Sequence, residues 1–88
     1  MRENNLEKFL KALANRRRIA IVRFLKKRKE APVGDISKEI KISFRATSRH
    51  LNVLASADIL EKEQRNVQVF YRINNNLLKA MNHVLSII

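Results

Sequence analysis

The segment 43–54, SFRATSRHLNVL, carries the side chains best suited to recognise another molecule. Arg45, Ser48, Arg49 and Asn52 recur at a spacing that places them on one face of a helix. Guanidinium, hydroxyl and amide groups are the groups that hydrogen-bond to base edges and phosphates. An ordinary solvated helix face is the alternative, so the surrounding elements must decide between the two.

The two histidines are the other side chains that could carry chemistry. His50 lies on the inner side of the same segment, beside Leu51, and His83 is likewise without a nearby partner in the sequence. We therefore expect His50 to be partly buried and hydrogen-bonded. There is no Cys, no paired-carboxylate arrangement and no Gly-rich phosphate loop, so we expect no catalytic residue, no metal site, no cofactor and no enzymatic activity.

The charge of the chain narrows the class of partner. It has 19 Lys and Arg against 8 Asp and Glu, a formal net charge of +11. A surface this basic attracts polyanions, and nucleic acid is the commonest polyanion inside a cell. Its 88 residues suit one small domain, 1–88. Without Cys or an apolar run of about 20 residues, we expect a cytoplasmic protein that does not enter a membrane.

The spacing of apolar residues predicts four helices between residues 5 and 57. Asn15 can cap the second helix, and the cations of residues 26–29, KKRK, suit its negative C-terminal end. Ser43 can cap the fourth. Because only Lys41 and Ile42 separate the third helix from the fourth, the pattern indicates a helix-turn-helix.

The periodicity changes after the fourth helix. Ala31-Pro32 is expected to break the chain after the second helix. Residues 60–73, LEKEQRNVQVFYRI, alternate with period two and are typical of strands. Arg65-Asn66 can turn a hairpin between them. After a capping segment at residues 74–76, NNN, a last helix with a broad apolar stripe is predicted.

Several of these segments together resemble a known family. LKALANRRRIAIVRFL (10–25), VGDISKEIKISFRATSRHLNVLASADIL (33–60) and VFYRI (69–73) resemble the corresponding segments of the ArsR-type winged-helix transcriptional regulators. The chain departs from the family at Lys41 and Asn66, where members usually have Gly, and lacks the Cys pair and ligand cluster of metal-sensing members. The resemblance implies a mainly α fold with a small β-hairpin, a winged helix-turn-helix in which a wing and a fifth helix follow four helices.

The resemblance and the charge together favour DNA binding over a merely solvated helix face. The fourth helix would then enter the major groove, and we call it the recognition helix. Arg16, Arg17 and Arg18 are either phosphate contacts or solvated, and Lys62, Arg65 and Arg72 are candidate contacts on the wing. The residues expected to contact DNA are Ser43, Arg45, Ser48, Arg49, Asn52, Arg65 at the wing tip and Arg18.

Phe44 stands out as an aromatic residue at an exposed position of the recognition helix. It could contact a thymine methyl group, or it could fold back against the third helix. We expect it to fold back.

The terminal helices offer more apolar surface than a small core needs. Packing within the chain is one explanation, and the resemblance implies another, a twofold homodimer whose recognition helices match half-sites about one DNA turn apart. The residues expected in the dimer interface are Leu6, Phe9, Leu10, Leu13, Leu78, Met81, Leu85 and Ile88.

The sequence therefore predicts a homodimeric, sequence-specific regulator that binds double-stranded DNA, most simply a repressor, without a metal-sensing site. Two alternatives remain: a protein that packages nucleic acid non-specifically, and a winged helix used to bind another protein. The operator, the regulated genes and any effector are not encoded in these patterns.

Overall fold

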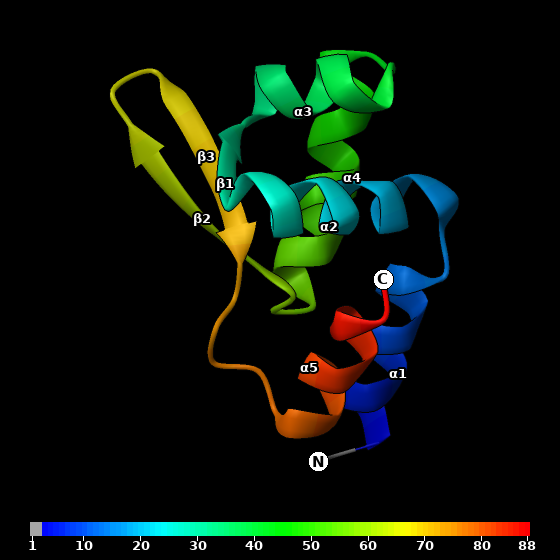
Figure 1. Cartoon of the computed structure of the whole chain (residues 1–88). Coiled ribbons are helices and arrows are strands. Elements are labelled where there is room, and N and C mark those ends of the chain that lie inside the picture. The colour runs from blue at the N-terminus through cyan, green and yellow to red at the C-terminus, as the bar shows by residue number, and fades with distance from the viewer. Residues whose placement is uncertain (1–2) are drawn as a thin grey trace.

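The computed structural model describes residues 3–88 (Figure 1). Five helices surround one face and one end of a small antiparallel sheet, and the β2–β3 hairpin projects from the body as a wing. None of the helices in this part of the chain is long and apolar enough to cross a membrane. The elements are α1 (Glu3–Leu13), α2 (Arg16–Arg28), β1 (Glu30–Pro32), α3 (Val33–Ile40), α4 (Phe44–Ser56), β2 (Leu60–Arg65), β3 (Gln68–Ile73) and α5 (Lys79–Ser86).

Local capping explains where the central helices begin. The Asn15 side chain accepts hydrogen bonds from the backbone N–H groups of Arg17 and Arg18 at 3.0 and 3.1 Å. Ser43 Oγ accepts one from the N–H of Ala46 at 3.0 Å. Each side chain satisfies donors that the first helical turn leaves without partners. Both caps confirm the sequence prediction.

The turn between α3 and α4 is built at some cost in backbone energy. Lys41 has φ 59° and ψ 45°, the left-handed conformation that glycine adopts most easily. Its N–H donates to the carbonyl of Ser37, whose own hydroxyl donates to the carbonyl of Ile42 at 2.7 Å. These bonds close the short turn of the helix-turn-helix although Lys41, not glycine, occupies the left-handed position.

The sheet contains a strand that the sequence analysis missed. At Ala31-Pro32 it predicted only a break, but Glu30–Pro32 pairs with β3, with Glu30 opposite Arg72 and Pro32 opposite Phe70. The strand order is therefore β1-β3-β2. β2 and β3 meet in a two-residue loop, Asn66 and Val67, in which Asn66 takes a positive φ of 57°.

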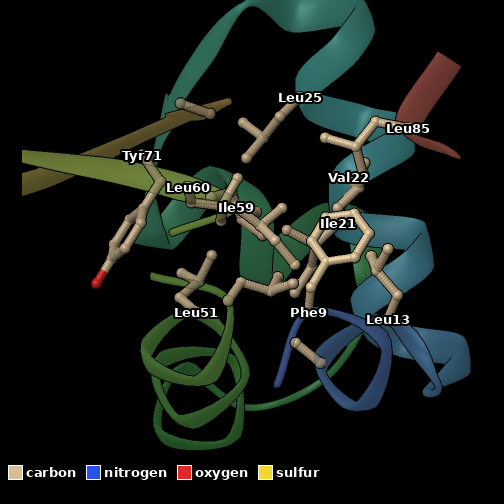
Figure 2. Close-up of a cluster of buried hydrophobic side chains, with 14 of the residues drawn as sticks. Phe9, Leu13, Ile21, Val22, Leu25, Leu51, Ile59, Leu60, Tyr71 and Leu85 are labelled. Atoms are coloured by element: carbon tan, nitrogen blue, oxygen red, sulfur yellow. The ribbon is translucent and has the colours of Figure 1, made fainter. Parts of the chain in front are cut away.

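One buried cluster joins the helices to the sheet (Figure 2). Ile21 and Val22 of α2, Leu51 of α4 and Ile59 before β2 are fully buried in it, and Phe9 of α1 closes one side. Tyr71 brings β3 into the same cluster. Burying a side chain of this size contributes about 1.5–3 kcal/mol, so this cluster sets the relative positions of α2, α4 and the sheet.

The terminal helices share this core, and half of the residues expected in the dimer interface are buried in it. Phe9 and Leu13 of α1 and Met81 and Leu85 of α5 are at most 8% exposed in a single chain. Such side chains offer no surface to a second copy, because α1 and α5 pack against the rest of their own chain. Of the other predicted residues, Leu6, Leu10 and Leu78 are 43%, 49% and 52% exposed, and Ile88 is half-buried.

The last helix begins later than predicted. Asn74 and Asn76 form a local turn, in which the Asn76 N–H donates to the Asn74 side chain, and the N-cap position falls on Leu78, without a side-chain cap. At the other end of α5, Lys26 Nζ donates to the carbonyls of Leu85 and Ser86 at 2.9 and 3.2 Å. A cation at this negative helix end stabilises it.

The left-handed residue in the turn gives a test of this fold. Lys41→Gly should raise the free energy of unfolding by about 0.5–1 kcal/mol, because glycine adopts a positive φ without the steric cost that a side chain adds. Urea unfolding of both proteins measures the difference. Lys38→Gly, at an exposed helical position nearby, is the matched control and should lower it by about 1 kcal/mol. A Lys41→Gly protein no more stable than the parent would contradict the strain.

Candidate nucleic-acid interface

The buried side of α4 fixes which side chains point outward. Thr47, Leu51 and Leu54 are fully buried, and the Thr47 hydroxyl donates to the carbonyl of Ser43 at 2.8 Å, so this polar group carries no desolvation penalty. The opposite side of the helix carries the predicted residues: Arg45, Arg49 and Asn52 are exposed, Ser48 is half-buried, and Ser43 is exposed at the cap. The structure thus brings all five onto one end and one face of α4.

A groove of about 610 Å³ separates α4 from the wing. Phe44, Ser48 and Asn52 line its helical wall, four residues apart, which places them in one row along α4. Lys62 and Gln64 of β2 line the opposite wall. Hydrogen-bonding groups therefore face the same space from both the helix and the wing.

Arg65 lies on the other face of the wing. Its guanidinium donates to both carboxylate oxygens of Glu30 at 2.9 and 2.8 Å and to Glu63 at 3.0 Å, and it stacks 4.5 Å from the Phe70 ring centre. These bonds hold the pKa of Glu30 and of Glu63 below the usual range and raise the pKa of Arg65. Arg65, which was expected to contact DNA from the wing tip, is the centre of an ion-pair cluster.

Arg72 completes that cluster. It donates to Glu63 at 3.1 Å and to Glu61 at 3.3 Å. The carboxylates of Glu61 and Glu63, which would repel phosphates, are therefore each paired with an arginine on the face of the sheet away from α4. Lys62, between them in sequence, alternates to the groove side.

Arg18 also has partners within the chain. Its Nε donates to the carbonyl of Ala12 at 2.6 Å, at the end of α1, and its Nη1 lies 3.3 Å from Nδ1 of His50. Arginine has no acceptor, so Nδ1 of His50 must accept this bond with a lone pair. Arg18 thus ties the corner between α1 and α2 to the recognition helix, whereas Arg16 and Arg17 are exposed.

His50 is half-buried and hydrogen-bonded, as predicted. Burial lowers its pKa, and the nearby charges of Arg18, Arg17 and Arg49 lower it further. The neutral imidazole is therefore the form that fits this position. Within residues 3–88, no group of three or more His, Cys, Asp or Glu is placed to hold a metal ion.

Two residues of the groove were missed or misplaced from the sequence. Phe44 is 60% exposed, so the expectation that it folds back against the third helix is wrong. Gln64 was not considered at all, although the period-two pattern of residues 60–65 places it on the same face as Lys62. The alternation, carried through β2, would have identified both groove-facing residues of that strand.

The helix-turn-helix and the wing that flanks its second helix define the class of the protein, a winged helix-turn-helix domain. Both the recognition helix and the three-stranded antiparallel sheet are parts of that fold. The sequence prediction of this fold is confirmed.

Comparison with known proteins identifies the family. A family model described as a helix-turn-helix domain matches residues 13–63. The transcriptional activator HlyU of Vibrio cholerae is 34% identical over 76 residues, which span 86% of this chain and 69% of HlyU. This chain belongs to the helix-turn-helix domain family of transcriptional regulators.

Solved structures agree with that assignment. The solved structure of HlyU from Vibrio cholerae superposes with a TM-score of 0.80 at 32% identity, over 97% of this chain and 94% of the chain in that structure. The homodimeric winged helix-turn-helix DNA-binding domain Mb0332 from Mycobacterium bovis, a possible ArsR-family regulator, gives 0.82 at 24% identity over 96% and 74%. The repressor PagR of Bacillus anthracis gives 0.79 at 24% identity over 96% and 92%. The resemblance to ArsR-type winged-helix regulators is confirmed.

The environment of His50 predicts a pH dependence of stability. Because folding lowers its pKa below 6.5, the unfolded chain binds more protons, and stability is lost as the pH falls from 6.5 toward the folded pKa. His50→Gln should therefore lose less stability than the parent between pH 7.5 and 5.5, as measured by urea unfolding.

The exposed Val53 of the same helix provides the control, because its side chain has no titratable group. Val53→Gln should keep the pH dependence of the parent. If His50→Gln keeps the whole decline as well, the Arg18–His50 contact does not favour the neutral imidazole.

Proposed function

We propose that residues 1–88 form one domain that acts as a homodimeric, sequence-specific DNA-binding transcriptional regulator. One observation carries the proposal. The outer side of α4 carries exposed cations and the row of Phe44, Ser48 and Asn52, and it lies opposite a fully buried inner face. The row lines a groove whose other wall is the wing. A helix whose polar side faces outward can enter the major groove of DNA and bring its hydrogen-bonding side chains to the base edges. The family membership and the net charge of +11 support the same partner.

Each exposed group on α4 has a chemically suited target on DNA. Arg45 and Arg49 can donate two bonds each to guanine O6 and N7, and Asn52 can pair with adenine N6 and N7. Ser48 can bond a base edge. The Ser43 hydroxyl accepts the capping bond from Ala46 and still has a proton to donate to a phosphate.

The two remaining predicted contacts are better explained as structural. Arg18 and Arg65 are each engaged by acceptors of their own chain. Breaking those bonds to reach a phosphate would leave Glu30 or the end of α1 without its partner. We therefore assign the phosphate contacts to Arg16 and Arg17 at the start of α2 and to Lys62 on the groove side of the wing, all of which are exposed.

Homodimerisation is proposed through the exposed part of the terminal helices. Leu6 and Leu10 lie one turn apart on α1, Leu78 precedes α5, and Ile87 follows it at 74% exposure. The structural neighbour Mb0332 is itself described as homodimeric. A twofold pair would place two recognition helices on half-sites about one helical turn apart.

The proposed output is repression by occlusion of a promoter. HlyU, the relative at 34% identity, is an activator, and PagR, a structural neighbour, is a repressor. In our proposal the position of the binding site relative to the promoter decides between activation and repression. The domain works in the cytoplasm, without catalytic activity and without a metal-sensing site.

A binding selection on randomised DNA duplexes tests the proposal against both alternatives. A sequence-specific regulator enriches one short, twofold-symmetric motif. A packaging protein would bind the pool without enriching any motif, and a protein-interaction module would bind negligibly at physiological salt. Either of these two results would overturn the proposal.

The recognition helix gives a prediction at the level of single residues. Arg45→Ala and Arg49→Ala should each weaken binding to the selected motif by about tenfold to a hundredfold, since a bidentate base contact is worth about 1–3 kcal/mol. Binding to a random duplex should fall much less. Fluorescence anisotropy on both duplexes at one salt concentration measures the two losses.

Lys27→Ala is the matched control, because Lys27 is an exposed cation on α2, outside the groove between α4 and the wing. It removes the same charge, so it should weaken the two duplexes equally and slightly. Equal losses for Arg45→Ala on both duplexes would show that this arginine contacts phosphate and reads no base.

The dimer is tested by Leu10→Glu. Placing a carboxylate in the exposed apolar patch of α1 should convert a dimer at tens of micromolar into a monomer, measured by light scattering, because the charge would be buried without a partner. Val67→Glu, at the 95% exposed wing loop, is the control and should remain dimeric. A parent protein that is monomeric under these conditions would refute the proposed interface.

A further inference from the structure

We propose that Phe44 is a further specificity-determining residue, which recognises a thymine through its C5-methyl group. This inference rests on the proposed function, since it concerns the same DNA-facing surface. It assigns a role to a side chain that hydrogen bonding to DNA cannot explain.

The exposure of Phe44 is the first observation. Its ring is 60% exposed on a single chain, although it was expected to pack against the third helix. Leaving most of this side chain in water forgoes part of the stabilisation that its full burial would bring. An exposed ring on a functional surface is explained if it becomes buried against the ligand.

The position of Phe44 is the second observation. It is the first residue of α4, and the N-terminal residues of a recognition helix are the ones that contact base edges. It also begins the row that Ser48 and Asn52 continue along the groove wall. Its ring therefore lies at the same surface as the two polar groups proposed to bond bases.

The chemistry of the base edges selects the target. Only thymine presents a methyl group in the major groove, whereas adenine, guanine and cytosine present hydrogen-bond donors and acceptors. A phenyl ring pressed against those polar groups would leave them without partners, which costs free energy. Against thymine it buries a methyl group instead, so the contact discriminates without a hydrogen bond.

The groove adds an apolar rim to this contact. Val67 at the wing loop, 95% exposed, and Val69 line the same groove as Phe44. Val33, at the start of α3, lines the groove as well. The methyl contact is therefore made at the edge of a mixed surface, polar along α4 and apolar at its beginning.

The test replaces thymine by uracil, which removes only the methyl group. In the motif selected by the wild-type protein, each thymine is changed to deoxyuridine symmetrically in both half-sites, and the Kd is measured by fluorescence anisotropy. We expect one thymine position at which uracil weakens binding by about fifteenfold, as the loss of one buried methyl group in each of the two half-sites implies.

Phe44→Gln and Phe44→Leu are the matched variants. Glutamine keeps the length and the helix propensity but not the apolar ring, so Phe44→Gln should bind the thymine and uracil duplexes equally. Leucine keeps an apolar side chain and should retain part of the preference. Since Phe44 is mostly exposed, both variants should unfold at the same urea concentration as the parent. The binding of the wild-type protein to the thymine and uracil duplexes is compared without any variant.

The possible outcomes separate this inference from the proposed function. A wild-type protein that enriches no motif overturns both. A wild-type protein that enriches a motif but binds thymine and uracil duplexes equally at every position overturns the role of Phe44 alone. So does Phe44→Gln with an unchanged thymine preference, because another residue would then recognise the methyl group.

Discussion

The burial of one face of α4 is the constraint on which the rest of the interface depends. Thr47, Leu51 and Leu54 are fully buried, so the rotation of the helix about its axis is fixed and its outer face is determined. Thr47 could destabilise such a core, but its hydroxyl donates to the carbonyl of Ser43. The hydroxyl of the same Ser43 caps the helix. One residue thus supports both the start of α4 and its buried side.

The wing is organised by charge. Glu61 and Glu63 would weaken DNA binding if they faced the phosphates, yet Arg65 and Arg72 engage both on the face away from α4. These pairs are partly exposed, so their effect on stability is small. Their importance is electrostatic: the two carboxylates are paired away from the groove, and Lys62 is the charged β2 residue that lines it. The alternation of the strand separates the two faces.

The parts of the fold that depend on local chemistry could be predicted from the sequence. Asn15 and Ser43 cap helices through bonds to residues two or three positions away, and such signals are visible in the letters. The bond from Arg18 to His50 spans 32 residues and that from Arg65 to Glu30 spans 35, so no local pattern indicates them. The partners of these two arginines within the chain therefore could not be predicted from the sequence.

The strand that the sequence analysis missed adds a second connection between the wing and the helix-turn-helix, beside the buried cluster. β1 has three residues, too few for a visible alternation, but Pro32 is both opposite Phe70 of β3 and the N-cap residue of α3. Glu30, at the other end of β1, holds Arg65 of β2. The wing is therefore bonded to the residues from which the helix-turn-helix begins. The width of the groove between Lys62 and Asn52 is consequently set by the fold. The helix that we propose to read bases and the wing that we propose to contact phosphates would therefore bind one duplex without first rearranging.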